Sequence, residues 1–130
     1  MSASRICVVV VSGSLERLQM AAMVASVGAV SGQEVMVFIS MNALLYFVKG
    51  NTSKAPHEGD MGRLMATKKV PEFMTLFEQA VELGDARIFP CSMAMDVLGV
   101  EQDGLEGYLQ KATGLTKFLH DAQDGQVWTF

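Results

Sequence analysis

Short apolar runs alternate along the chain with longer stretches whose apolar positions recur at the spacing of a helix. The runs at residues 6–11 and 34–40 predict strands that are buried on both faces, as in a parallel sheet. Residues 86–89 predict a third strand, and residues 126–130 predict the last. Because helical stretches separate these strands, we expect right-handed crossovers and an α/β domain whose sheet is covered on both faces.

Helical spacing predicts six helices, and the residues at some of their ends support the assignment. The first is preceded by Ser12 and Ser14, either of which can cap it. In the third, Pro71 suits the first turn and Gly84 is placed to end the helix. The predicted helices cover residues 15–30, 42–48, 71–84 and 92–98, a stretch marked by Leu105, Tyr108, Leu109 and Ala112, and a stretch marked by Leu115, Phe118 and Leu119.

The predicted helix at residues 15–30 is apolar nearly all round. It can bury one side against the sheet, but its other side then needs a second apolar surface. The composition agrees, since 50% of the residues are hydrophobic and only 18% are charged, with a mean hydropathy of +0.28. We therefore expect copies of the chain to associate.

The net charge of −4 and the pI near 5.0 argue against nucleic acid and anionic membrane surfaces as partners. Such partners are bound by a basic stripe, whereas the lysines and arginines here are scattered. We expect no secretory signal, because residues 1–5 run directly into a strand, and no membrane span, because the apolar stretch at 18–33 is too short. The two cysteines make no disulfide framework, so we expect a cytoplasmic protein with reduced thiols.

Chemistry in a parallel sheet is expected at the carboxyl ends of its strands. Three segments should meet there: Ser12-Gly13-Ser14, Met41-Asn42 and Pro90-Cys91-Ser92. Only the third contains a strong nucleophile, Cys91, predicted beside the first free N–H groups of a helix, where a thiolate is favoured over a thiol. A buried structural cysteine stays open as an interpretation of Cys91, and it is the one we expect for Cys7, which lies inside a valine-rich strand.

Several other residues are candidates for the pocket around Cys91. The turn at Ser12 and Gly13 could cradle a phosphate, but the pattern G-x-G-x-x-G is absent and a helix cap is the stronger interpretation. Methionines near the cysteine predict a soft apolar wall rather than a copper(I) site. We expect no metal and no organic cofactor. The candidates that come from the strand ends and from the helix after the cysteine are Ser12, Gly13, Asn42, Ser92, Met93 and Met95.

Residues 50–69 are polar, contain glycine and lack any periodicity. A structureless loop of about 20 residues is uncommon in a compact domain and is usually functional. We expect this loop to be more mobile than the rest of the chain and to lie over Cys91 as a lid. It adds Met61 and Met65 to the candidate pocket, and Lys68 as a residue that could hold an anion.

The segment Phe89-Pro90-Cys91-Ser92-Met93-Ala94-Met95-Asp96-Val97-Leu98-Gly99 resembles the cysteine signature of the DsrE/DsrF/DsrH-like family. In the DsrE-type branch this signature is approximately a cysteine, a small polar residue, Met, a small residue, and then Met-Asp-Val-x-Gly. Further segments match in the same order, so that the resemblance spans nearly the whole chain. They are Ser12-Gly13, Phe38 through Asn42-Ala43-Leu44, and the methionine-containing loop before Val70-Pro71.

The resemblance implies a single three-layer α/β/α domain over residues 1–130, with a mainly parallel sheet of four to five strands, assembled as a homotrimer or hexamer. It implies a cytoplasmic sulfur carrier or sulfurtransferase that accepts sulfane sulfur on Cys91, as a persulfide or thiosulfonate, and passes it to a partner thiol. The partners that it implies are a TusA-like sulfur carrier and a rhodanese-type protein, in sulfur oxidation or sulfur trafficking. A non-catalytic module that binds a small anion or a nucleotide on the same fold is the alternative hypothesis.

Overall fold

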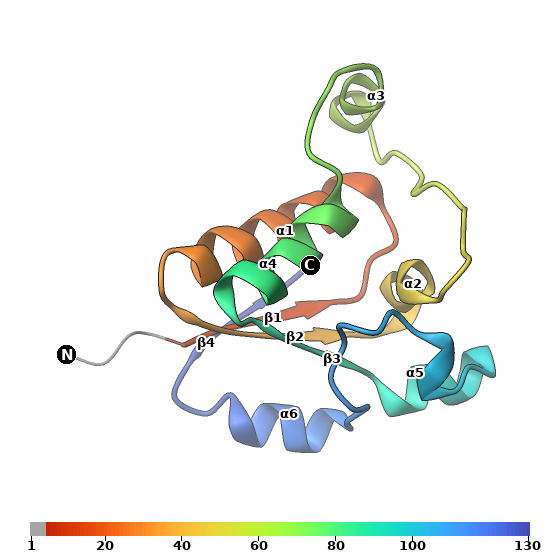
Figure 1. The fold of residues 1–130 in the computed structure, drawn as a ribbon. Coiled ribbons are helices and arrows are strands. Elements are labelled where there is room, and N and C mark those ends of the chain that lie inside the picture. Colours follow the sequence, from red (N-terminus) through yellow and green to blue (C-terminus); the bar gives the residue numbers. More distant parts are fainter. Residues whose placement is uncertain (1–4) are drawn as a thin grey trace.

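The chain forms one four-stranded sheet and the helices that connect its strands (Figure 1). A computed structural model describes residues 5–130; residues 1–4, where we expect no secretory signal, lie outside this range. The strands are β1 (Arg5–Val10), β2 (Glu34–Ile39), β3 (Arg87–Pro90) and β4 (Gln126–Thr129). The helices are α1 (Leu15–Val30), α2 (Met41–Leu44), α3 (Asp60–Thr67), α4 (Phe73–Gly84), α5 (Ser92–Leu98) and α6 (Leu115–Asp121), with short 3-10 helices η1 (Leu45–Phe47) and η2 (Gln102–Gly104).

The strands lie in the order β3-β2-β1-β4, and every neighbouring pair is parallel. β1 is paired on both sides, so that Cys7 lies opposite Met36 of β2 and Val127 of β4. Parallel neighbours need long crossover connections, which the helices supply. The predicted α/β fold with a parallel sheet is therefore confirmed. Within the described residues, no helix is both long enough and apolar enough to cross a bilayer.

Helices cover both faces of the sheet and complete three layers (Figure 1). On one face α1 and α4 pack against each other and α1 contacts β1 and β2. Gly28 of α1 lies so close to the sheet that a Cβ there would be 3.0 Å from the Ile6 Cδ1 and 3.3 Å from the Val35 Cγ2. On the other face Phe118 of α6 packs against the sheet, and its ring centroid lies 5.1 Å from that of Phe38. Ile6 and Val35 thus mark the α1 face, and Phe38 marks the α6 face.

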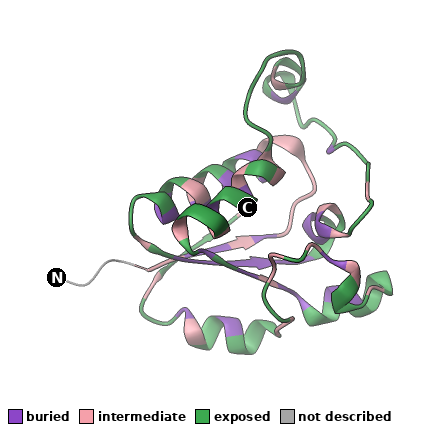
Figure 2. Ribbon diagram, viewed as in Figure 1, coloured by how far each residue is buried: buried purple, intermediate pink, exposed green. Residues whose placement is uncertain are grey.

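Buried residues concentrate in the sheet and on the helix sides that face it (Figure 2). Phe47 and Phe77 are fully buried, with ring centroids 5.4 Å apart in an edge-to-face arrangement. The contact between α1 and α4 is close because small residues line it, and a Cβ on Gly84 would lie 2.5 Å from the Ala29 Cβ. The buried alanines of α1 are Ala21, Ala22, Ala25 and Ala29.

The outer side of α1 is apolar and exposed, as its sequence predicts. Ser14 caps the helix, because its Oγ accepts a hydrogen bond from the Arg17 N–H at 3.4 Å. The small residues of the helix and Leu18 are buried on its inner side, whereas four other large apolar side chains lie on the outer side. Between 43% and 64% of each is exposed: Met20, Met23, Val27 and Val30.

Two predicted boundaries are wrong. The loop expected at 50–69 contains α3, so the lack of apolar periodicity there does not mean a lack of helix. α4 begins at Phe73 after an extended N-cap at Glu72, so Pro71 precedes the helix instead of lying in its first turn. At the other end Gly84 is the last helical residue, and Asp85 adopts the left-handed conformation with φ of 57°.

The helix predicted from Leu105, Tyr108, Leu109 and Ala112 does not form. Residues 110–113 instead run along the outer edge of β3, where the Gln110 N–H donates to the Ile88 carbonyl at 2.7 Å. An open strand edge leaves backbone groups without partners, so an extended segment that pairs with it outweighs a helical pattern. The apolar residues still serve the core, since Leu105 is 1% exposed.

Candidate functional site

The carboxyl ends of β1, β2 and β3 lie side by side, as the topology predicts. The Cys91 N–H donates to the Ile39 carbonyl at 2.9 Å, and the Ser40 N–H donates to the Val10 carbonyl at 3.0 Å. These bonds extend the sheet by one residue beyond β2 and β3. Cys91 therefore occupies the carboxyl edge of the sheet, next to the central strand β2.

The backbone around Cys91 is fixed from both sides. Its N–H bonds to β2, while on the outer side the Thr113 N–H donates to the Pro90 carbonyl and the Ser92 N–H donates to the Thr113 carbonyl, both at 3.0 Å. Cys91 is also the N-cap residue of α5, with extended backbone angles of −75° and 121°, and its carbonyl accepts the Met95 N–H at 3.0 Å. The backbone of Cys91 is thus held in one place, and 5% of the residue is exposed.

The start of α5 presents backbone N–H donors in the residues that follow Cys91. The first N–H groups of a helix have no acceptor within the helix. That of Ser92 is used by Thr113, whereas those of Met93 and Ala94 have no acceptor among residues 5–130. The Cys91 side chain makes no capping hydrogen bond with them, so both donors stay available to an anion that binds at the start of α5.

Cys7 has different surroundings. It is fully buried in β1, and burial raises the pKa of its thiol. The registers place Cys7 level with Met36 and Met36 level with Arg87, four residues before Cys91 along the strand direction. Four residues span about 13 Å, so the two thiols are far apart and both are free. The prediction that Cys7 belongs to the core is confirmed.

The structure brings Ser12, Gly13 and Asn42 together but leaves little space between them. A Cβ on Gly13 would lie 3.0 Å from the Asn42 Cβ, and the Tyr46 hydroxyl donates to the Gly13 carbonyl at 3.2 Å. The Ser12 Oγ accepts the Ser14 N–H at 3.0 Å. This turn serves as the entrance to α1, and its capping role agrees with the stronger of the two sequence interpretations.

Two exposed methionines, Met41 and Met93, lie shortly after the strand ends that meet at the carboxyl edge of the sheet, and we call them the apolar rim. Met93, two residues after Cys91, is 50% exposed, whereas Met95 is buried on the inner side of α5. Met41 is the first residue of α2, two residues after the end of β2; it is 55% exposed and has a φ of 52°. Left-handed backbone is costly for a residue with a side chain and often marks a functional position. Nothing in the sequence distinguishes Met41 apart from its place after a strand.

The segment expected to cover Cys91 lies elsewhere. The Glu16 carboxylate at the start of α1 accepts the N–H groups of Glu58 and Gly59 at 2.8 Å and that of Gly62 at 3.1 Å. These bonds hold α3 beyond the start of α1, far from α5 (Figure 1). Met65 and Lys68 line a groove with residues of α1 and α4, not with Cys91. The structure therefore does not bring Met61, Met65 or Lys68 to Cys91.

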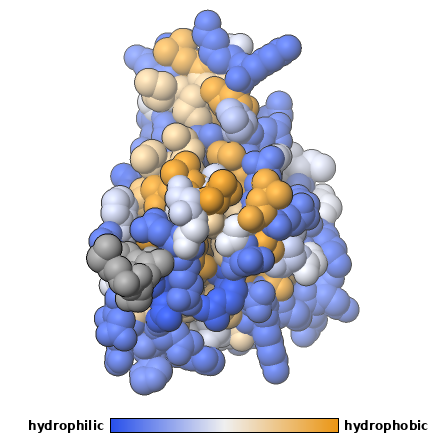
Figure 3. Space-filling model, turned by 60° about the vertical axis from the view of Figure 1, so that its left-hand side comes forward, coloured by the Kyte–Doolittle hydropathy of each residue, from blue (hydrophilic) through white to orange (hydrophobic). Residues whose placement is uncertain are grey.

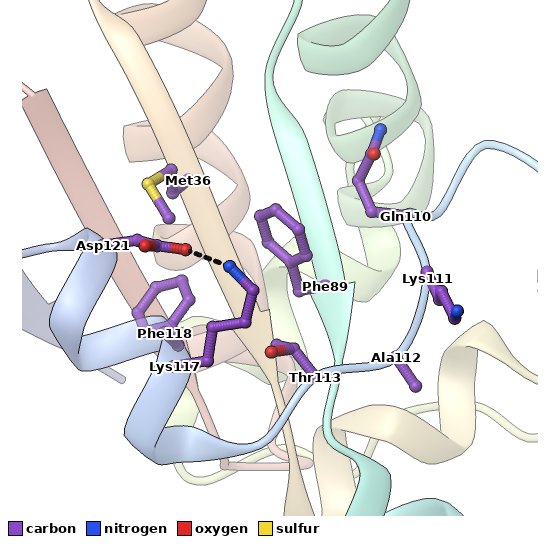
Figure 4. A pocket seen from close by; sticks show the side chains of 9 residues that line it. All are labelled: Met36, Phe89, Gln110, Lys111, Ala112, Thr113, Lys117, Phe118 and Asp121. Carbon is purple, nitrogen blue, oxygen red and sulfur yellow. Dashed lines mark hydrogen bonds and ion pairs between the residues drawn. The ribbon is translucent and has the colours of Figure 1, made fainter.

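A cavity of about 180 Å³ lies on the α6 face of the sheet, beside the segment that leads to Cys91. Phe89, Phe118 and Met36 form its apolar wall, and Lys117 crosses its mouth to bond Asp121 at 2.9 Å (Figure 4). Cys91 does not line it, but Thr113 does, and Thr113 bonds to both neighbours of Cys91. Sequence reasoning missed this cavity, because the segment at 110–113 was expected to be helical.

The fold and the site define a class of protein: a parallel α/β domain with a cysteine at the carboxyl edge of its sheet. The chain belongs to the DsrE/DsrF/DrsH-like family, which matches residues 42–130 and thus includes Cys91. The chain resembles the ychN protein from E. coli, with a TM-score of 0.71 and 13% identity over 99% of this chain and 100% of that one.

A second solved structure has the same fold. It is MTH1491, a protein of unknown function from Methanobacterium thermoautotrophicum, with a TM-score of 0.70 and 10% identity over 98% of this chain and 99% of that one. At these identities the likeness concerns the fold. No curated protein matches the sequence.

Proposed function

We propose that this protein is a sulfur carrier or sulfurtransferase that accepts sulfane sulfur on Cys91. The observation that carries the proposal is the placement of Cys91 within the family-matched region, at the carboxyl edge of the sheet. Of the two cysteines, Cys91 alone reaches the surface, since Cys7 is fully buried.

The transfer needs two displacement steps at sulfur. The Cys91 thiolate attacks the outer sulfur of a donor persulfide, the donor S–S bond breaks, and the donor leaves as a thiolate. The product is a persulfide on Cys91. A partner thiolate then attacks the outer sulfur of this persulfide, and Cys91 leaves as a thiolate. Each step forms one S–S bond and breaks another, so no external oxidant or reductant is needed.

The surroundings of Cys91 suit this chemistry. The free N–H groups of Met93 and Ala94 can donate to the charged terminal sulfur of a persulfide on Cys91. Because little of Cys91 is exposed, a partner thiol has to approach closely. The apolar rim at Met41 and Met93 offers a surface for that contact, and methionine side chains adapt readily to different partners.

The partners proposed for this transfer are a TusA-like sulfur carrier and a rhodanese-type protein, in the cytoplasm. Family resemblance supports these two classes. For the protein itself we propose a homotrimer or a hexamer, and the exposed apolar side of α1 supports association between copies. The alternative of an anion-binding or nucleotide-binding module has less support, because Asn42 and Tyr46 fill the space around the turn at Gly13.

Sulfur loading tests the proposal. The protein is incubated with polysulfide, and mass additions of one sulfur atom are mapped by peptide. We expect the addition on Cys91, its loss in Cys91→Ser, and its retention in Cys7→Ser. Loading that is confined to Cys7, or that persists in Cys91→Ser, contradicts the proposal.

A further inference from the structure

One outer edge of the sheet is covered by another segment of the chain, and the other is open. Residues 110–113 cover the outer edge of β3, where the Gln110 N–H bonds the Ile88 carbonyl and the Thr113 N–H bonds the Pro90 carbonyl. At the other side of the sheet, β4 is the last strand, and no segment within residues 5–130 pairs with its outer edge. An open edge of this kind is a template for another strand.

β4 is only four residues long, but it lacks the charged residues and prolines that usually protect an edge. Its sequence, Gln-Val-Trp-Thr, contains no charge and no proline, and valine, tryptophan and threonine all favour strands. All four residues are exposed, with Val127 at 48% and Trp128 at 44%. Two copies of β4 can approach each other without like-charge repulsion between the strands.

The hydrogen bonds to β1 determine which backbone groups of β4 point outward. The Phe130 N–H donates to the Val9 carbonyl, and the Phe130 carbonyl accepts the Val11 N–H, both at 2.8 Å. In a parallel ladder the residues alternate between the two sides of the strand. Trp128 therefore directs its backbone groups to β1, and Val127 and Thr129 direct theirs away from the sheet.

We propose that β4 pairs antiparallel with β4 of a second copy, across a two-fold axis at Trp128. In this register Val127 of one copy lies opposite Thr129 of the other, and the two residues exchange both of their N–H···O=C bonds. The same exchange repeats on the other side of the axis, so every outward N–H and C=O of these residues has a partner. The spacing is self-complementary because Val127 and Thr129 are placed symmetrically about Trp128, as an isologous contact requires.

The surface next to β4 fits the same partner. Trp128 is in register with Val8, so its side chain lies on the α1 face. On this face Ile6 and residues of α1 line a groove of about 330 Å³, with Met20, Met23 and Val27 along it. Apolar side chains gather across the middle of the molecule in Figure 3. Pairing through β4 would place the two tryptophans side by side and bring a second copy of α1 toward this groove.

The pairing is independent of the sulfur chemistry. β4 and β3 are at opposite sides of the sheet, so Cys91 stays open to other proteins. A trimer whose copies also pair through β4 is a hexamer, which connects this contact with the proposed assembly.

The chain mass and its single tryptophan provide the first test. We expect light scattering to give an even multiple of 14.1 kDa. In Thr129→Pro the outward N–H is removed while the bonds to β1 are kept, so the mass should be halved and the Trp128 emission should shift to longer wavelength. Thr129→Val keeps the N–H and should match the parent. A monomer, an odd multiple, or an unchanged mass in folded Thr129→Pro overturns the proposal.

Cross-linking provides a second test that does not depend on how Thr129→Pro folds. Residues on the two-fold axis form a non-hydrogen-bonded pair with Cα atoms about 4.5 Å apart, within the range of a disulfide. In a Cys91→Ser background, Trp128→Cys should therefore form a disulfide-linked dimer on mild oxidation. Thr129→Cys is the matched control, because its two copies would be about 7–8 Å apart on the diagonal. Equal cross-linking of both variants, or none with Trp128→Cys, overturns the register.

Discussion

The Cys91 N–H and the Ile39 carbonyl are joined by a hydrogen bond of 2.9 Å, which makes the cysteine the last paired residue of its strand. The bond also explains why a proline is tolerated immediately before it. Residues of β3 alternate between β2 and the outer edge, so Pro90 directs its missing N–H away from β2 and only its carbonyl is needed, by Thr113. Pro90 thus ends the strand without weakening the central ladder, and α5 can begin one residue after Cys91.

The first prediction concerns the reactivity of the two thiols. Iodoacetamide at pH 8 should label Cys91 in the native protein and label Cys7 only after unfolding, because Cys7 is fully buried and burial raises its pKa above 9.0. Peptide mapping with and without guanidinium chloride measures both sites. Native labelling of Cys7 at a rate equal to that of Cys91 would contradict the assignment.

The raised pKa of Cys7 also predicts a pH dependence of stability. A thiol whose folded pKa lies above its unfolded value stabilises the fold below the unfolded pKa, and this contribution is lost as the pH rises through the folded pKa. The unfolding free energy should therefore fall above about pH 9. The fall should be smaller in Cys7→Ala, compared by urea titration at pH 7.5 and 10. Equal falls in the two proteins would assign the effect to other groups.

A further prediction concerns Phe118, which is 1% exposed and packs against Phe38 and Phe89. Phe118→Ala should lower the unfolding free energy by about 3–5 kcal/mol, because it removes a buried ring and enlarges the cavity beside β3. Leu119→Ala is the matched control on the same helix, since Leu119 is 47% exposed and should change stability by about 0.5 kcal/mol or less. Chemical denaturation measures both, and similar losses would contradict the packing described for α6.

The strands and the longer helices could be predicted from the sequence because each carries its own pattern. The run at β1 has to be buried on both faces, and the apolar periodicity of α1 and its cap at Ser14 are local. Cys91 could be placed for the same reason, since the end of a parallel strand and the start of a helix are both visible in the sequence. These features depend on residues within one element.

The errors concern features that depend on distant partners. Residues 110–113 are extended because they pair with β3, and helical spacing contains no information on that edge. The position of α3 depends on Glu16, more than 40 residues earlier, whose carboxylate binds three backbone N–H groups. Nothing near residues 50–69 in the sequence indicates this contact. It holds α3 at the start of α1, and for this reason the expectation that Met61, Met65 and Lys68 lie beside Cys91 is wrong.

Another prediction concerns Met41, whose φ of 52° is unfavourable for a residue with a side chain. Met41→Gly relieves about 1–2 kcal/mol of backbone cost and adds about 0.5–1 kcal/mol of chain entropy, so stability should be unchanged or slightly higher. If Met41 contacts the partner of Cys91, the same variant should slow sulfur transfer to a carrier thiol several-fold.

Asp85→Gly is the matched control for Met41→Gly. Asp85 has a similar φ of 57° but lies at the amino end of β3, away from Cys91. It should gain a similar amount of stability with no effect on transfer. The rate of sulfur transfer to a carrier thiol is measured for both variants after loading with persulfide. Equal rates for Met41→Gly and Asp85→Gly would show that the rim at Met41 has no part in docking.

The last prediction concerns the Glu16 carboxylate, which holds the turn before α3 through the N–H groups of Glu58, Gly59 and Gly62. These hydrogen bonds, that from Glu58 above all, lower the pKa of Glu16 below its ordinary value of 4.5. A carboxylate whose folded pKa is lowered stabilises the structure above the ordinary pKa, and the contribution is lost as the pH falls through the lowered value. We therefore expect the turn to stay fixed at neutral pH and to loosen only below about pH 4.5.

The amide protons of Gly59 and Gly62 report this directly in a two-dimensional NMR titration. Both signals should move together with one midpoint below pH 4.5, and the movement should vanish in Glu16→Gln. Gly62→Ala should displace the carboxylate, because a Cβ there would lie 2.5 Å from the Glu16 Oε1. Glu82→Gln removes an equal charge from α4 and should leave both signals unchanged. A midpoint at or above 4.5, or a titration that persists in Glu16→Gln, would mean that a group other than the Glu16 carboxylate anchors the turn before α3.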